Sequence, residues 1–146
     1  MHITRYTDYS LRVLMYVALK GEEISTIREI AESYDISKNH LMKVVQALNS
    51  EGYLIALRGK NGGLRLNGRP EDINIGALVR HTEQDFALVE CFGSDNGCII
   101  TPACQLKFVL AEALEAFFKT LDKYTLADLL PTARQGELVR LLEIPV

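Results

Sequence analysis

Residues 25–52, STIREIAESYDISKNHLMKVVQALNSEG, contain two short helical patterns joined by a tight turn. We expect the first helix over residues 27–34 and the second from residue 38 to about residue 51. Capping residues precede both, Ser25 or Thr26 before the first and Ser37 before the second. The second segment spaces Leu41, Val44, Val45 and Leu48 by one, three or four residues, which places them on one inner face. Two such helices, with the second amphipathic and basic, are typical of a helix-turn-helix.

The outer face of the second predicted helix gathers side chains that suit DNA. Lysine reaches phosphate or guanine, and asparagine and glutamine can bond adenine through two atoms at once. Each residue taken alone is an ordinary solvated surface residue, so the argument rests on their concentration on one face. Together with the two caps, the candidate DNA contacts here are Thr26, Ser37, Lys38, Asn39, His40, Lys43 and Gln46.

A predicted β-hairpin follows directly. Strand patterns at residues 53–57 and 64–66 flank a turn, residues 58–63, that holds two cations and three glycines. Behind a recognition helix, such a hairpin is typical of a wing, because its glycines permit close backbone approach and its cations can enter a narrow minor groove. The candidate contacts at its tip are Arg58, Lys60, Asn61 and Gly62. The fold class predicted for the chain is mainly α, with a winged helix-turn-helix domain over residues 1–82.

Two further helices complete this predicted domain. Thr7 opens an apolar stretch that ends near Lys20, which indicates a buried first helix. Asp8 and Arg12 stand four residues apart at its exposed start, so they share a face. A fourth helix is expected over residues 75–81.

A long helix is expected from Pro102 to Tyr124, and a further turn extends this dimerisation helix to residue 130. Its apolar stripe is wider than a complete small domain can cover, so we expect the helix to pack on a second copy in a homodimer. The stripe consists of Leu106, Val109, Leu110, Ala113, Leu114, Phe117 and Leu121. The tail, residues 131–146, is expected to be loosely ordered, although Leu138, Leu141 and Leu142 could dock.

The charge of the chain is unevenly distributed. The net charge is −3 over 146 residues, which by itself argues against nucleic acid. Residues 36–69, however, carry six basic residues against Glu51 alone. A local basic patch is sufficient for phosphate contacts, although a solvated basic face is the alternative on charge alone.

Several classes of protein are disfavoured by what the sequence lacks. We find no secretory signal pattern and no apolar run near the ~18 residues of a membrane span, so we expect a cytoplasmic protein without a membrane partner. We also find no nucleophile-and-base motif, phosphate-binding loop or dinucleotide fingerprint. The chain is therefore predicted not to be an enzyme.

All three cysteines, Cys91, Cys98 and Cys104, lie within a predicted loop over residues 83–104. Thr101-Pro102 indicates a helix start, which would place Cys104 in a first turn where the helix dipole favours a thiolate. Three thiolates on one loop can close around a metal centre, but a closed zinc site or four-iron cluster usually takes four ligands. Packing as small hydrophobic residues, or a disulfide with one thiol left over, are the alternatives.

The order of these features resembles the iron–sulfur winged-helix transcription regulators over roughly residues 1–130. The specific marks are residues 7–12 (TDYSLR), residues 58–63 (RGKNGG) and the cysteine spacing. One branch takes a histidine three residues after the last cysteine as fourth ligand, where this chain has Lys107. The nitric-oxide-sensing branch pairs its cysteines with a first-helix aspartate of the other subunit, and Asp8 stands at that position. The chain is more similar to this second branch.

The resemblance implies a homodimeric repressor whose binding to double-stranded DNA is controlled by a nitric-oxide-sensitive iron–sulfur cluster, 4Fe–4S preferred and 2Fe–2S possible. The ligands it implies are the three cysteines and Asp8 of the other subunit, and a carboxylate is the weaker ligand for this soft centre. On loss of the cluster, Asp8 would pair with Arg12 and the two DNA-binding units would shift. Alternatives on the same scaffold are a regulator of iron–sulfur homeostasis, a redox or zinc thiol switch, or a regulator that works as apoprotein.

Overall fold

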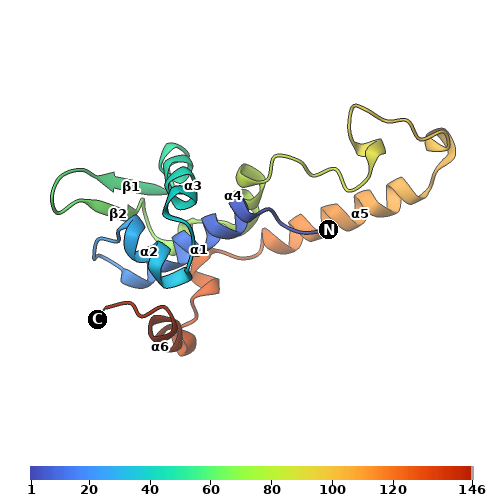
Figure 1. The fold of residues 1–146 in the computed structure, drawn as a ribbon. Helices are drawn as coiled ribbons and strands as arrows, with labels where there is room; N and C mark the ends of the chain where they lie inside the picture. Colours follow the sequence, from blue (N-terminus) through green and yellow to red (C-terminus); the bar gives the residue numbers. More distant parts are fainter. Residues whose placement is uncertain (146) are drawn as a thin grey trace.

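The structure, a computed structural model, describes residues 1–145 of the chain. The elements in this range are α1 (Arg5–Lys20), α2 (Ile27–Tyr34), α3 (Lys38–Ser50), β1 (Leu54–Leu57), β2 (Gly63–Leu66), α4 (Ile75–Thr82), α5 (Leu106–Leu121) and α6 (Thr132–Leu141), with short 3-10 turns between some of them. Residues 1–82 and 123–145 form a head, and residues 83–122 form an arm that projects from it (Figure 1). The wing and the arm lie at opposite ends of the molecule. None of the helices described is long and apolar enough to cross a membrane.

The first helix begins earlier than its apolar pattern predicts. Thr4, not Thr7, is the N-cap of α1, because the Thr4 hydroxyl accepts a hydrogen bond from the backbone N–H of Thr7 at 3.3 Å. The expectation that the helix opens at Thr7 is therefore wrong. Thr7 lies inside the helix and is fully buried, and its hydroxyl donates to that of Thr82 at the end of α4, at 2.8 Å. The start of α1 is thus fixed to the last turn of α4.

The helix-turn-helix forms over the predicted residues. Thr26 caps α2 and Ser37 caps α3, and Asp35 between them adopts the left-handed conformation that turns the chain. The four apolar residues predicted on the inner face of α3 are all buried, at no more than 5% exposure. They pack in one core with α1, α2 and α4, to which α1 contributes Val13, Leu14 and Val17. The predicted fold class, mainly α with a winged helix-turn-helix, is confirmed.

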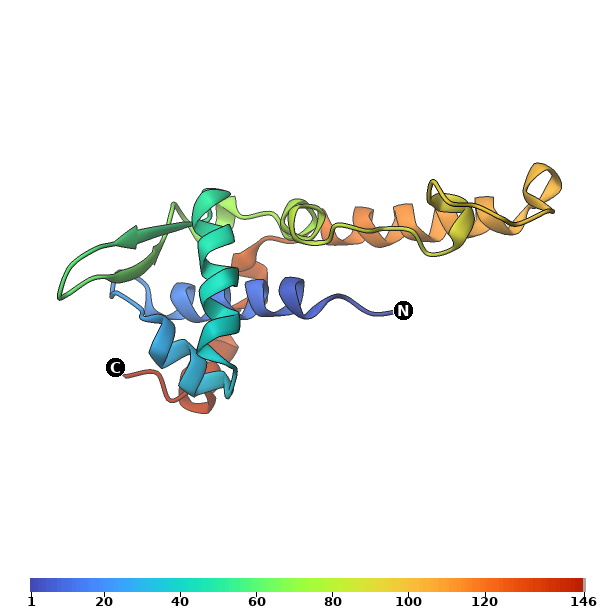
Figure 2. The same ribbon diagram turned by 45° about the horizontal axis from the view of Figure 1, so that its top comes forward.

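The wing is an antiparallel hairpin in which Leu54 pairs with Leu66 and Leu57 with Gly63. It is tied to the start of α2, because Ser25 and Leu64 exchange two backbone hydrogen bonds of 3.0 and 2.7 Å. Beyond this anchor the hairpin tip extends past α3 into solvent (Figure 2). The base of the wing is therefore anchored to the rest of the head, while its tip is exposed.

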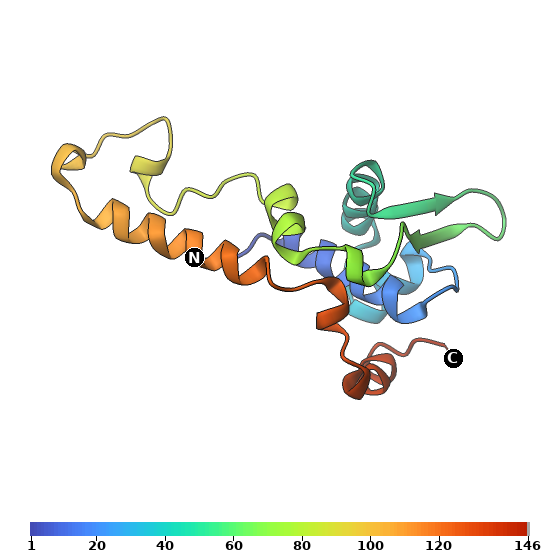
Figure 3. The ribbon, with the colours of Figure 1, turned by 180° about the vertical axis from the view of Figure 1, so that it is seen from behind.

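The C-terminal segment is ordered, so the expectation of a loosely ordered tail is wrong for residues 131–145; Val146 lies outside the described residues. After α6 the chain turns back against the rest of the head (Figure 3). Leu142 and Ile144 are buried in the head core, and the Ser33 hydroxyl of α2 donates to the Leu142 carbonyl at 2.7 Å. Of the three leucines expected to dock, Leu142 is buried and Leu138 half-buried, whereas Leu141 remains 65% exposed.

Candidate DNA-binding face and cysteine loop

The exposed face of α3 carries most of the side chains predicted to meet DNA. Lys38, Asn39, Lys43 and Gln46 are all exposed on it. His40 differs, because it is half-buried with its ring edge-on to that of Tyr9 in α1, at 4.8 Å between centroids. The recognition helix is thereby held against α1 at its first turn while the rest of its outer face stays open.

The two predicted caps lie at the N-termini of the two helices. The Thr26 hydroxyl accepts from the backbone N–H of Glu29 at 3.2 Å, and that of Ser37 accepts from the N–H of His40 at 3.4 Å. Both residues are exposed. Their hydroxyls therefore satisfy helix N–H groups, and the remaining free N–H groups beside them are suited to a phosphate.

Two residues of the same α3 face were missed by the sequence analysis. Met42 is 49% exposed and follows Asn39 by three, and Asn49 is exposed and follows Gln46 by three. Helical spacing extended from Asn39 and Gln46 is the signal that would have found them. Met42 offers apolar contact of the kind that recognises a thymine methyl group. The side-chain oxygen of Asn49 already accepts a hydrogen bond from the N–H of Ala56 in β1 at 3.3 Å, so its side-chain amide group is the part that remains for DNA.

The wing tip presents two free cations. Arg58, Lys60 and Asn61 are exposed, and neither Arg58 nor Lys60 forms an ion pair within residues 1–145. Gly62 has a structural reason to be glycine, since a Cβ there would lie 2.1 Å from the Leu57 carbonyl oxygen. Closure of the hairpin thus accounts for this glycine, whose predicted DNA contact would come from its backbone alone.

Asp8 and Arg12 form the pair that their spacing predicts. The guanidinium donates from Nε to one carboxylate oxygen at 3.1 Å and from a terminal nitrogen to the other at 2.9 Å. Arg12 also lies 5.7 Å from the ring centroids of both Tyr9 and Tyr34. The Tyr34 hydroxyl donates to the Arg12 carbonyl at 3.0 Å, and burial raises the pKa of Tyr34 to about 12. This cluster joins the start of α1 to α2 through Tyr34 and to α3 through Tyr9 and His40.

The three cysteines lie on the arm and none forms a disulfide; Cys98 is exposed and the other two are half-buried. Cys104 is not in the first turn of a helix, so that prediction is wrong. Residues Thr101–Ala103 form only a 3-10 turn, Cys104 is extended, and α5 begins at Leu106. The Thr101 hydroxyl donates to the Cys98 carbonyl at 2.8 Å instead of capping a helix. Cys104 therefore lies just before Gln105, the N-cap of α5, and outside the helix itself.

The fit of these residues to a metal centre is divided between chemistry and position. Three free thiols on one polar loop are the donors that iron–sulfur clusters prefer. Yet nowhere in residues 1–145 do three or more His, Cys, Asp or Glu side chains come close enough to hold a metal ion. The donor set thus fits an iron–sulfur centre, while its assembly requires the loop to close and a further ligand from outside the loop.

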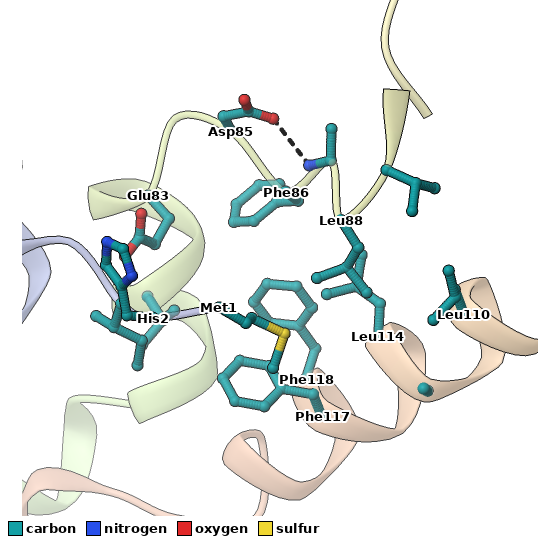
Figure 4. A pocket seen from close by; sticks show the side chains of 15 residues that line it. Met1, His2, Glu83, Asp85, Phe86, Leu88, Leu110, Leu114, Phe117 and Phe118 are labelled. Atoms are coloured by element: carbon teal, nitrogen blue, oxygen red, sulfur yellow. Dashed lines mark hydrogen bonds between the residues drawn. The ribbon is translucent and has the colours of Figure 1, made fainter. Parts of the chain in front are cut away.

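The arm is almost wholly uncovered. None of the residues of α5, all of which the structure describes, is buried, and Leu106, Val109 and Phe117 are 60%, 60% and 37% exposed. A groove of about 740 Å³ runs between α5, residues 83–89 and the N-terminus (Figure 4). Its lining is mainly apolar and includes Leu114 and the Phe86 and Phe118 rings, which meet edge-on at 5.0 Å. The stripe predicted for dimerisation has no complete cover within its own chain.

The chain is similar in sequence and in fold to known transcriptional regulators. The chain is 56% identical over 132 residues to the HTH-type transcriptional regulator NsrR of Bacillus licheniformis. The matched region covers 89% of this chain and 92% of that protein. The chain is 53% identical to NsrR of Bacillus subtilis over 146 residues, 99% of each chain. Among solved structures it resembles CymR, the global cysteine regulator of B. subtilis, with 27% identity, a TM-score of 0.72 and coverage of 88% and 95%. The T. potens IscR structure gives 25% identity, a TM-score of 0.73 and coverage of 93% and 90%.

A family model spans most of the chain. It matches residues 3–132 and describes the Rrf2 family as iron-dependent transcriptional regulators. Because these relatives regulate transcription, the prediction that the chain is not an enzyme is confirmed. Together with the winged helix-turn-helix and the extended arm, this match shows that the chain belongs to the Rrf2 family of transcriptional regulators.

Proposed function

We propose that the protein is a cytoplasmic transcriptional repressor that binds a two-fold symmetric operator as a homodimer and releases it in response to nitric oxide. The observation that carries the proposal is the separation within one chain of the DNA-facing α3 and wing from the three thiols on the arm (Figure 1). A signal received at the thiols can reach the DNA-binding elements most directly through a second subunit. The identity of about half to relatives named NsrR supports the same function.

The second subunit covers the apolar stripe of α5. Leu106 and Val109 belong to an exposed apolar stripe of the kind that marks an interaction surface, and the groove beside Leu114 and Phe118 continues the same surface. Packing of two copies about a two-fold axis buries both features and holds the two heads apart. Each α3 then enters a major groove, with half-sites about one helical turn apart, and each wing tip lies beside the duplex.

The residues that would hold an iron–sulfur cluster are Cys91, Cys98 and Cys104 with Asp8 of the partner subunit. When bound, the cluster supplies an iron atom that nitric oxide can attack. We prefer the 4Fe–4S type because three thiolates and one carboxylate give one ligand per iron, and a 2Fe–2S cluster is the alternative. The carboxylate is the weakest of these donors toward iron.

Arg12 competes for the same carboxylate. Its two donors occupy both oxygens of Asp8 in this structure, and its guanidinium lies near Tyr9 and Tyr34. When Arg12 is paired with the Asp8 carboxylate, its guanidinium also lies near Tyr34 of α2 and near Tyr9. The Tyr9 ring in turn contacts His40 of α3. A change at Asp8 is thereby transmitted to both helices of the DNA-binding unit, and operator affinity falls.

The test combines composition and binding. Protein purified without oxygen is analysed for iron, sulfide and visible absorbance, and its affinity for operator DNA is measured before and after addition of nitric oxide. We expect Asp8→Ala to change both the rate of reaction with nitric oxide and the operator affinity. Asp95→Ala, which removes an exposed aspartate within the cysteine loop, is the matched control and should behave as wild type. If Asp8→Ala matches the control in both measurements, Asp8 has no part in the switch.

A second candidate is a thiol switch or zinc-dependent regulator on the same scaffold. The observation that favours it is that the three cysteines are free and at least partly exposed, and that the chain resembles a solved structure of Staphylococcus aureus CymR in an oxidized form. A colourless protein containing zinc, or one whose DNA affinity responds to thiol oxidation without iron, would establish this candidate instead. Regulation of iron–sulfur homeostasis is disfavoured by Lys107, which replaces the expected fourth ligand of that branch.

A further inference from the structure

The arm is attached to the head at the last turn of α5. Phe118 and Leu121 pack against the head core, whereas Leu106 and Val109 at the other end of the helix are exposed. Since no residue of this fully described helix is buried, the direction in which α5 leaves the head depends on the contacts at its C-terminal end.

An ion pair forms the centre of that attachment. Arg80 of α4 donates two hydrogen bonds to Asp122, the C-cap of α5, at 2.5 and 3.0 Å. The guanidinium carbon lies 4.7 Å from the ring centroid of Phe118, one turn earlier in α5. The Arg80 fork holds the pKa of Asp122 below its usual range, so the pair is intact near neutral pH. Such a two-point contact fixes orientation as well as distance.

The backbone around Asp122 is held by α4 as well. Asn74, the N-cap of α4, donates from its side-chain amide to the Asp122 carbonyl at 2.8 Å. Immediately beyond, the N–H of Ile75 donates to the Tyr124 carbonyl at 2.9 Å, and that of Leu126 donates to the Ile73 carbonyl at 2.8 Å. These bonds register the end of α5 against the start of α4.

Gly76 lets the two segments approach this closely. A Cβ at this position would lie 1.9 Å from a carboxylate oxygen of Asp122 and 3.0 Å from its backbone nitrogen. A side chain here could be accommodated only if the Asp122 backbone and its carboxylate moved away from α4. Gly76 is buried and adopts helical conformation, so this close contact, and no special backbone angle, explains the glycine.

We infer that the clamp formed by Arg80 and Asp122 over Gly76 sets the angle at which α5 leaves the head, and thereby selects the half-site spacing that the dimer accepts. The inference rests on the proposed dimeric, DNA-binding function. At 1.5 Å per residue, α5 is a lever of about 24 Å, and a tilt of about 10° at its base displaces its far end by about 4 Å. This displacement is comparable to the rise of about 3.4 Å per base pair.

The test measures spacing preference. The full wild-type chain selects a palindromic duplex from random DNA, and affinities are then measured for that duplex with one base pair inserted or deleted at its centre. We expect Arg80→Gln to reduce the preference for the selected spacing about fivefold, as expected for the loss of one partly exposed ion pair. Gly76→Ala should move the preferred spacing by about one base pair. Arg69→Gln is the matched control, because Arg69 pairs with Asp72 in the head through two bonds of 3.3 Å away from α5.

The outcomes separate the inference from the function on which it rests. A changed spacing profile in Arg80→Gln, with an unchanged profile in Arg69→Gln, supports the clamp. An equal loss of affinity at every spacing would mean that Arg80 contacts phosphate and would overturn the inference, as would a profile identical to wild type. Arg80→Gln decides the matter if Gly76→Ala fails to fold. A wild-type protein that selects no palindromic duplex would overturn the proposed function and the inference with it.

Discussion

The head and the arm of this chain are held in place by different means. The head buries residues from α1, α2, α3 and α4 together with Leu126, Leu142 and Ile144 from the end of the chain. The arm contains α5, which has the same length as α1. The structure describes every residue of α5, and none of them is buried. The head therefore has a hydrophobic core of its own, whereas the apolar stripe of α5 is not covered by its own chain. Under the proposed function, this difference would place the sensing chemistry where two subunits meet and leave DNA binding to the head.

The largest effect should come from truncating the same side chain in the two regions. Leu126→Ala removes a fully buried leucine of the head and should lower the free energy of unfolding by about 3 kcal/mol. Leu106→Ala removes one that is 60% exposed and should change it by less than about 0.5 kcal/mol. Urea unfolding at a concentration where the chain is monomeric measures both. Equal losses would mean that α5 is buried by its own chain in solution.

The next prediction concerns the cover of the arm. Val109→Asp places a charge in the exposed stripe of α5 and should weaken dimerisation by about 2 kcal/mol, because the carboxylate would be desolvated without a partner. Sedimentation equilibrium gives the dimer dissociation constant. Lys119→Gln, on the charged side of the same helix where Lys119 pairs with Glu115 at 2.9 Å, is the control and should leave the dissociation constant nearly unchanged. A Val109→Asp protein that remains fully dimeric would show that another surface joins the subunits.

Alkaline pH should weaken the head specifically. Since the pKa of Tyr34 is raised from 10.0 to about 12, its contribution to stability is fully present below pH 10 and is lost as the pH rises toward 12. We expect a loss of about 1 to 2 kcal/mol over this window, reduced because the ring is only partly buried. Tyr34→Phe should abolish this part of the pH dependence, although it also removes the bond to the Arg12 carbonyl. Unfolding curves of both proteins at about pH 9, 10 and 11 would measure this difference. Parallel pH dependences of the two proteins would mean that Tyr34 does not cause the loss of stability.

The smallest effect is one of salt dependence. Lys60→Ala at the wing tip should reduce the slope of log affinity against log salt concentration by about 1, because one phosphate contact is lost. Lys107→Ala removes the same charge from the arm, where its ammonium lies 5.0 Å from the Phe108 ring centroid. It should leave the slope unchanged. A similar decrease in both variants would mean that the arm also lies along the duplex.

Local sequence signals were sufficient for the helix-turn-helix and the wing. Thr26 and Ser37 indicate helix starts in the sequence because a side-chain cap acts over only three residues. The buried face of α3 follows from the spacing of its apolar residues alone. The Asp8–Arg12 pair follows from the same helical geometry. Its packing against Tyr34 does not, since that contact joins residues 22 apart through the fold.

Features fixed by distant contacts were predicted poorly. The tail looks weakly ordered because its order comes from the core around Leu142 and from Ser33, 109 residues away. One local signal was also misleading: Thr101-Pro102 indicates a helix start, but the Thr101 hydroxyl donates to the Cys98 carbonyl, and Thr101–Ala103 form only a 3-10 turn. The Arg80–Asp122 clamp joins residues 42 apart, and nothing in either local sequence indicates it. Whether the cysteines and Asp8 act together depends on a second chain, which the sequence of one chain suggests only by resemblance.

The position of the N-terminus has a practical consequence for anyone preparing this protein. Met1, His2 and Ile3 line the groove beside α5 (Figure 4), so any peptide fused ahead of Met1 emerges at the surface that we assign to the second copy. An uncleaved purification tag there would compete with assembly, and the resulting material would sediment as monomer and bind operator weakly. Affinities measured on such material would describe the tag rather than the regulator.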